Sequence, residues 1–263
     1  MKIPIYQVDA FSRTTFGGNP AAVCPLESWI YDKTMQSIAA ENALSETAFI
    51  VPRGDDWEIR WFTPVQEVEL CGHATLGSGY VVLTELQPKR EVVRFASKSG
   101  ELTVAREGDR LAMELPRWEP VPVAAPAPEL VAALGAAPRE ILAHGSKYMC
   151  VYDSASDVAG LRPDFGRMRK LDRYGVVVTG PGAEYECDFV SRFFAPAAGV
   201  DEDPVTGSAH CLLVPYWAKE LRRSSLYGKQ ISARGGELWC ALGGEYVRLA
   251  GYVAPYLAGE IEV

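Results

Sequence analysis

Two short segments of the sequence combine glycine with polar residues directly before an apolar run. Gly72-His73 precede one run, and Gly207-Ser208 precede the other. The first turn of a helix leaves backbone N–H groups free and carries a partial positive charge, and glycine lets an anion approach closely. We therefore expect both helix starts to bind a carboxylate or phosphate. The alternative is two ordinary helix starts, with Ser208 as a normal N-cap residue.

Glu46 is the candidate acid/base. It lies between a predicted helix and a predicted strand, beside the apolar residues 48–51. Partial desolvation favours the protonated form of a carboxyl group, which suits a group that must take and return a proton. The alternative is a solvated surface glutamate.

His73 and Asp203 are candidate substrate-binding residues. His73 can donate a hydrogen bond or relay a proton, and Asp203 can orient an amino or hydroxyl group. The alternatives are a capping histidine and a loop aspartate that sets up the turn before Pro204. Asp201, Glu202 and Asp203 are consecutive acids, which favours partial solvation.

Cys71 could act as a thiolate base, because a thiol at a helix N-terminus can be acidified. A racemase needs a second base on the opposite face of its substrate. The matching position of the second segment holds Val205 or Thr206, and neither side chain can act as a base. Cys211 lies one helical turn too far along to be at the helix N-terminus. We interpret Cys71 as a packing or supporting residue.

Several other chemistries lack their motifs. The three histidines, 73, 144 and 210, form no metal-binding spacing, so no metal is expected. There is no GxSxG nucleophile elbow and no GxGxxG or Walker motif, so no nucleotide cofactor is implied. Of the chemistries considered, the one that these residues still allow is general acid/base catalysis by a carboxylate in an anion-binding cleft.

Composition narrows the class of protein further. Of the 263 residues, 48% are hydrophobic and 23% charged, as in a globular protein, and the formal net charge is −8. An acidic chain without basic runs argues against nucleic-acid binding. No segment is apolar for long enough to span a membrane or to act as a signal peptide, and the six cysteines show no CxxC pair. We expect a cytoplasmic protein.

The hydropathy pattern predicts an α+β chain of two similar halves. Predicted helices cover 31–43, 74–86, 129–134 and 208–221. Predicted strands cover 3–9, 56–62, 91–96, 101–106, 109–115, 175–179, 185–194, 237–242 and 245–250. Five prolines between 116 and 128 indicate a boundary. The expected domains are 1–117, to which a strand at about 253–263 returns, and 118–252.

Residues 67–86 and 202–221 form a weak internal repeat. Each has an acidic start, a turn with glycine, and small residues that open a mostly apolar helix. A helix that is apolar on nearly all sides is buried. We therefore expect each half to wrap a curled, mostly antiparallel, barrel-like sheet around one central helix.

The sequence resembles the PhzF family of phenazine-biosynthesis-like proteins, which share a fold with diaminopimelate epimerase and proline racemase. The matching segments run in order over nearly the whole chain: YQVDAF, FGGNPAAV at 16–23, ALSETAFI at 43–50, ELCGHATLGSGY at 69–80, SGELTV at 99–104, RFFAP at 192–196 and GVDEDPVTGSAHCLLVPYWA at 199–218. CGHAT and EDPVTGSAH together are highly specific.

The resemblance implies a cofactor-independent isomerase whose active site lies in a cleft between two domains. It places the acid/base on Glu46 and substrate binding on His73, Asp203 and Ser208, with Gly72 and Gly207 holding the anionic group through their backbone. It implies proton transfer on a dihydro-hydroxyanthranilate-type carboxylate, and a homodimer.

Two other functions are compatible with the same residues. One is an epimerase or racemase of an amino or hydroxy acid, which would need a second base. The other is a non-catalytic relative that binds a small molecule or a protein. The racemising relatives of this fold use two cysteines, and this sequence resembles them in Cys71-Gly72-His73 but lacks the second cysteine.

Overall fold

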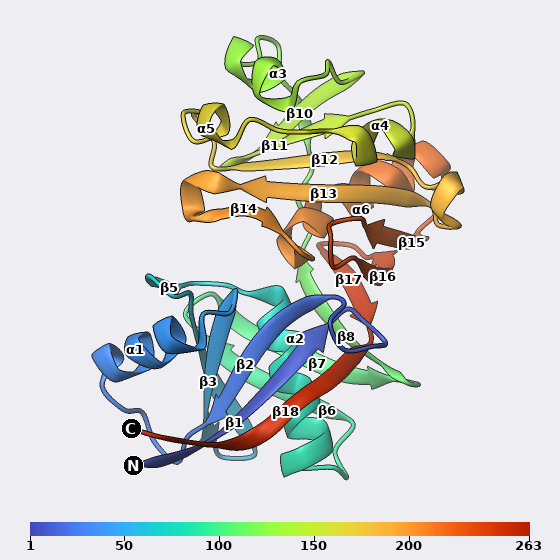
Figure 1. Cartoon of the computed structure of the whole chain (residues 1–263). Coiled ribbons are helices and arrows are strands. Elements are labelled where there is room, and N and C mark those ends of the chain that lie inside the picture. Colours follow the sequence, from blue (N-terminus) through green and yellow to red (C-terminus); the bar gives the residue numbers. More distant parts are fainter. The chain divides into compact units, whose positions relative to one another are not determined.

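The computed structural model describes residues 1–263, and the chain forms two compact units. Unit 1 comprises residues 1–115 and 248–263, and unit 2 comprises residues 116–247. Each unit is sheet-dominated with few helices, so the fold is α+β (Figure 1). No helix is both long enough and apolar enough to cross a membrane.

Unit 1 is a curled mixed sheet whose strands pair in the order β18, β1, β2, β3, β4, β6, β7 and β8 without closing into a barrel. β2 with β3 and β4 with β6 are parallel, and the other pairs are antiparallel. Its strands are β1 (Lys2–Ala10), β2 (Asn19–Pro25), β3 (Glu46–Arg53), β4 (Asp56–Phe62), β5 (Glu67–Val68), β6 (Val92–Ser97), β7 (Gly100–Glu107), β8 (Arg110–Pro116) and β18 (Val253–Glu262). Its helices are α1 (Asp32–Asn42), α2 (Gly72–Val81) and the π-helix η1 (Val82–Leu86).

The last strand returns to the first strand of the chain. β18 pairs with β1 over its length, from Lys2 opposite Glu262 to Ala10 opposite Val253. Figure 1 shows the red β18 lying along the blue β1, with the two termini close together. Unit 2 is therefore inserted between β8 and the segment that completes unit 1.

Helix α2 is the buried helix of unit 1. Eight of its residues are buried, because the sheet curls around it. Two of its glycines permit this close packing. A Cβ at Gly77 would lie 2.7 Å from Val8 on β1, and a Cβ at Gly79 would lie 2.5 Å from Val104 on β7. Any larger residue at either position would push the helix away from a strand.

Unit 2 is also built from a mixed sheet. Its strands are β9 (Val121–Pro122), β10 (Glu140–His144), β11 (Lys147–Val151), β12 (Gly175–Pro181), β13 (Phe189–Ala195), β14 (Val200–Asp203), β15 (Ser225–Gln230) and β16 (Gly236–Leu242), and β17 (Tyr246–Gly251) leads out of it. Its helices are α3 (Pro128–Leu134), α4 (Ala155–Gly160), α5 (Phe165–Met168) and α6 (Gly207–Leu221), with the 3-10 turns η2 (Ala183–Tyr185) and η3 (Pro196–Ala198).

The two faces of the unit 2 sheet carry different helices. One face packs against α3, α4 and α5 through a cluster that includes Tyr148, Cys150 and Val178. Side chains alternate between faces along a strand, so Thr179 points to the other face. There it accepts a hydrogen bond of 2.9 Å from Trp217 on α6. Eleven residues of α6 are buried, so α6 is the central helix of this unit.

The predicted elements agree with the structure in most places. All four predicted helices are present, and Gly135 ends α3 in the left-handed conformation. The predicted strand 185–194 begins later, at Phe189, because residues 183–185 form the turn η2. Strands β2, β10, β11, β14 and β15 and the short strands β5 and β9 were not predicted, since their segments show little alternation of apolar and polar residues or are too short to show it.

Candidate functional site

Glu46 is the first residue of β3 and lies at the end of a tight connection from α1. Helix α1 ends because Ala43 adopts the left-handed conformation. The Asn42 side chain then donates a 3.0 Å hydrogen bond to the buried Thr47 hydroxyl. β3 pairs in parallel with β2, which places Glu46 opposite Ala21. The backbone on both sides of Glu46 is thus fixed.

Glu46 and His73 are in contact. Oε2 of Glu46 lies 3.1 Å from Nε2 of His73, and the two side chains are 19% and 6% exposed. The two atoms lack the alignment of a full hydrogen bond, so the contact is a close charge pair with one partner, Glu46, open to solvent. The fold thus brings together two residues that are separated in the sequence by the rest of β3 and by β4 and β5.

Cys71 contacts the other nitrogen of the same imidazole. Its Sγ lies 3.6 Å from Nδ1 of His73. Burial raises the pKa of the Cys71 thiol, and the nearby charge of Glu46 raises it further. Burial alone would lower the pKa of His73, but Cys71 and Glu46 outweigh burial and raise it well above its ordinary value.

These three side chains do not form a chelate for one metal ion. Their donor atoms all lie within 4.8 Å of one another. However, Nδ1 of His73 faces Cys71 and Nε2 faces Glu46. The two nitrogens lie on different edges of the ring, so one ion cannot bind the imidazole together with both neighbours. The three side chains form a row, in which the imidazole of His73 contacts the thiol of Cys71 on one side and the carboxylate of Glu46 on the other.

The start of α2 offers free backbone donors beside this chain. Cys71 is the N-cap residue, and its side chain makes no capping hydrogen bond. Gly72 and His73 occupy the first two helical positions, where N–H groups have no partner within a helix. Helix α2 is ten residues long and has no acidic residue in its first turn. An anion bound there would receive these hydrogen bonds and the favourable helix dipole.

The start of α6 has the same local form. Its N-cap residue is Thr206, with φ −116° and ψ 101°, close to the φ −140° and ψ 111° of Cys71. Gly207 and Ser208 are the first two helical residues, so Ser208 is not the N-cap. Thr206 makes no capping hydrogen bond, because its hydroxyl donates to Oδ2 of Asp203 instead. The N–H groups of Gly207 and Ser208 are thus not used by a capping side chain.

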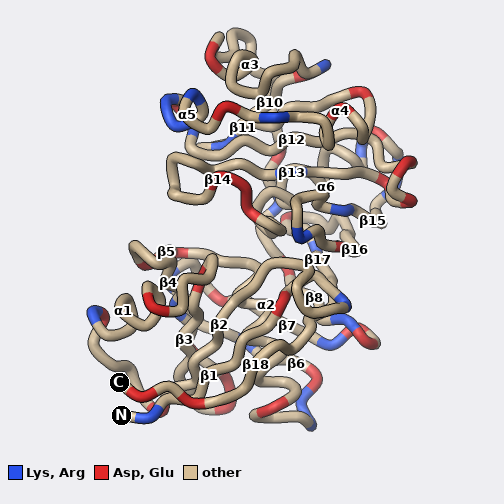
Figure 2. Tube along the Cα trace, viewed as in Figure 1, with Lys and Arg blue, Asp and Glu red and all other residues tan.

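Asp203 lies at the end of β14 and is held by a residue that the sequence did not point out. Gln230, which is buried, donates 2.8 Å to the Asp203 carbonyl and accepts 2.9 Å from the Thr206 N–H. Gln230 sits opposite Ser191 in the register of β13 with β15. No motif marks it, because its role depends on that strand pairing. Figure 2 shows the acidic run along β14 that Asp203 ends.

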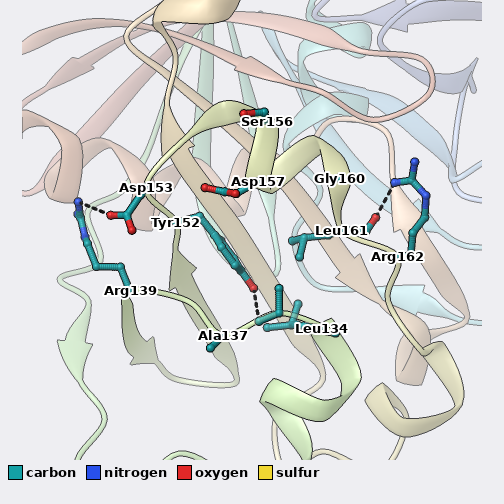
Figure 3. A pocket seen from close by; sticks show the side chains of 12 residues that line it. Leu134, Ala137, Arg139, Tyr152, Asp153, Ser156, Asp157, Gly160, Leu161 and Arg162 are labelled. Atoms are coloured by element: carbon teal, nitrogen blue, oxygen red, sulfur yellow. Dashed lines mark hydrogen bonds and ion pairs between the residues drawn. The ribbon is translucent and has the colours of Figure 1, made fainter.

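A separate pocket of about 550 Å³ lies elsewhere in unit 2, and none of the expected site residues lines it. Figure 3 shows its lining side chains from the 134–139 and 152–162 segments. Its charged groups are engaged, since Arg139 pairs with Asp153 at 3.6 Å and Arg162 donates to the Leu161 carbonyl at 2.9 Å.

The chain has an α+β fold in which each unit wraps its sheet around a buried helix with an open N-terminus. The sequence model of the phenazine biosynthesis-like (PhzC-PhzF) family matches residues 8–251. The chain belongs to this family. The predicted family and fold class are thereby confirmed.

Two proteins of similar sequence match this chain over their whole length. An uncharacterized isomerase of Pseudomonas aeruginosa is 49% identical over 100% of both chains. The crystal structure of a PhzF-family phenazine biosynthesis protein of Enterococcus faecalis matches with a TM-score of 0.94 and 41% identity, over 100% of both chains. A hydroxyproline epimerase of Agrobacterium vitis matches at 11% identity and a TM-score of 0.64, over 99% of this chain and 92% of its own, which is a likeness of fold alone. The relatives support an isomerase-type enzyme.

Proposed function

We propose that the protein is a cofactor-independent isomerase that moves a proton between carbons of a small carboxylate, with Glu46 as the general acid/base. The observation that carries this proposal is the 3.1 Å contact between Glu46 and the buried His73. His73 fixes one carboxylate oxygen of Glu46. Because the Glu46 side chain is 19% exposed, a substrate can still reach the carboxylate.

The proton transfer needs only one carboxylate. Glu46 removes a proton from one carbon, the electron pair of the broken C–H bond delocalises into the substrate, and Glu46 returns the proton to a second carbon on the same face. Charge that develops on the substrate can be stabilised by backbone N–H groups at a helix start. A dihydro-hydroxyanthranilate-type ring is one substrate on which such a shift is possible.

In this proposal the two helix starts act on the same substrate. The N–H groups of Gly72 and His73 on α2, and of Gly207 and Ser208 on α6, hold its anionic group. Asp203 accepts from a hydroxyl or amino group of the substrate while Thr206 and Gln230 keep it in place. The Ser208 hydroxyl, which is half-buried, supplies a further hydrogen bond.

The racemase alternative is less well supported by the site. It needs two bases, and the candidate Cys71 is buried, with a raised pKa that keeps its thiol protonated. A buried thiol of raised pKa is a poor base at neutral pH. The non-catalytic alternative does not require the Glu46–His73 contact.

The test is the variant Glu46→Gln, with Glu41→Gln as the control, because Glu41 is an exposed acid on the neighbouring helix α1. Candidate substrates are dihydro-anthranilate-like and amino-acid carboxylates, and turnover is followed with deuterium uptake from D₂O. Glutamine keeps the shape but cannot cycle a proton, so Glu46→Gln should lose roughly a hundredfold or more in turnover.

Binding should survive in Glu46→Gln, because backbone N–H groups make the anion contacts. The proposal is wrong if Glu46→Gln keeps near-normal turnover while Cys71→Ala abolishes it. Deuterium uptake from both enantiomers of an amino acid would favour the racemase.

A further inference from the structure

Lys147 is the one lysine or arginine of the chain that is buried, with an exposed fraction of 6%. It is the first residue of β11. Its stem passes over Gly175, where a Cβ would lie 3.2 Å from Cγ of Lys147. Its ammonium group lies 4.9 Å from the ring centre of Trp118 and 5.1 Å from that of Tyr174. The backbone and two rings thus hold this side chain in a defined place.

The ammonium group of Lys147 has no counter-ion. No carboxylate lies within 4.0 Å of it, and it donates no hydrogen bond to any group of the chain. Most of the side chain is buried, but Nζ is not among the buried polar atoms that lack a partner, so the tip of the ammonium group reaches solvent. An anion from outside the chain can therefore reach a positive charge that no carboxylate of the chain neutralises.

Lys147 lies on the face of the sheet that α6 covers. It shares this face with Met149 and Val151, because Tyr148 and Cys150 point into the cluster on the opposite face. The Trp118 backbone N–H donates 3.1 Å to the carbonyl of Cys211, which is in α6 one turn after Ser208. Burial raises the pKa of the Cys211 thiol to about 12, and the positive charge of Lys147 opposes this rise. The ammonium group is therefore close to the first turns of α6.

We propose that Lys147 binds a second anionic group of the substrate whose first carboxylate is held at the start of α6, so that the natural substrate is a dicarboxylate. This inference rests on the proposed function for the position of the first carboxylate. A carboxylate fits better than a phosphate, because Lys147 is a single cation. The nearby Arg173 is directed elsewhere, with its guanidinium 5.2 Å from the ring centre of Tyr148.

Binding of unreactive probes tests the inference without turnover. The probes are the dicarboxylates from malonate to adipate and the monocarboxylates of matching length, measured by titration calorimetry on the full chain. The variant is Lys147→Met, and the control is Lys219→Met, which removes an exposed lysine from the far end of α6. We expect at least one dicarboxylate to bind the wild type about tenfold or more tightly than its monocarboxylate, and this preference to vanish only in Lys147→Met. Equal affinities for both series in the wild type, or an unchanged preference in Lys147→Met, would overturn the inference.

The melting temperature gives a second readout. A dicarboxylate that binds Lys147 should raise the melting temperature of the wild type more than that of Lys147→Met. An equal rise in both proteins would overturn the inference. Lys147→Arg keeps the charge and should retain the preference for dicarboxylates. Loss of turnover in Glu46→Gln tests the proposed function separately, since the probe affinities do not depend on proton transfer.

Discussion

The imidazole of His73 bridges Glu46 and Cys71, with Nε2 3.1 Å from the carboxylate of Glu46 and Nδ1 3.6 Å from the thiol of Cys71. The ring is buried, yet its pKa is raised well above the ordinary value, because its neighbours outweigh the effect of burial. A buried imidazole of raised pKa thus contacts a carboxylate that is partly exposed.

The first prediction concerns the charge of His73. Glu46→Gln removes one of the two neighbours that raise the pKa of His73 and leaves Cys71 and burial, which lowers it, so this pKa should fall. An NMR titration of the three histidines, assigned with single His→Gln variants, measures it. A raised folded-state pKa stabilises the protein below pH 6.5 and loses this effect as the pH rises through the folded-state pKa. Wild type and Glu46→Gln should therefore differ most in stability at low pH; an unchanged His73 titration would contradict the prediction.

The second prediction concerns Asp203. In Asp203→Asn the side-chain oxygen can still accept the hydrogen bond from Thr206, so α6 keeps its start. Turnover should fall by roughly tenfold, less than the hundredfold expected for a lost general base. Comparison of kcat and KM with Asp201→Asn, an exposed acid two residues earlier, measures the effect. A loss as large as that of Glu46→Gln would assign Asp203 to proton transfer.

The third prediction concerns Gln230, which connects Asp203 to Thr206. Gln230→Met keeps the length of the side chain but leaves the Thr206 N–H and the Asp203 carbonyl without their partner. The loss in free energy of unfolding should be about 1 to 3 kcal/mol, measured by urea denaturation. Gln66→Met, at an exposed position, should change little. If both variants unfold alike, the buried amide does not hold the start of α6.

The fourth prediction concerns acid stability. Burial lowers the pKa of His210 to about 4, although its hydrogen bond to the Thr206 carbonyl opposes this. An unfolded chain binds the proton near pH 6.5, so the folded state loses stability as the pH falls from about 6.5 to 4. The contribution is about 3 kcal/mol.

Urea denaturation of wild type and His210→Asn between pH 7 and 4 measures this contribution. The variant has no imidazole at this position, so its unfolding free energy should fall less steeply with acid. His144→Asn, at an exposed position, is the control and should follow the wild type. Parallel curves for wild type and His210→Asn would remove His210 as the cause.

The helices and the local form of the site could be predicted because their signals are local. Gly72 and Gly207 mark two helix starts in the sequence, and the apolar runs after them predict the buried helices α2 and α6. The contact of Glu46 with His73 could only be inferred by resemblance, since it depends on how β3 is placed beside α2.

The residues that sequence analysis missed have roles that depend on tertiary structure. Gln230 reaches Thr206 only through the parallel register of β13 and β15. In the sequence, Lys147 cannot be distinguished from an ordinary surface lysine. The strand that it begins, β11, is buried at every position and shows no alternation of apolar and polar residues. A strand buried on both faces has no polar side from which its position could be recognised.

The pairing of β18 with β1 determines the order in which the two units can fold during translation. Unit 2 is one continuous stretch of chain and can fold as soon as it has been synthesised. β1 is made before unit 2, but its partner β18 is made only after the whole of unit 2. During translation β1 therefore has an unpaired edge, and unpaired strand edges attract other chains. Unit 1, which carries Glu46 and His73, therefore completes its sheet only after unit 2 has been synthesised.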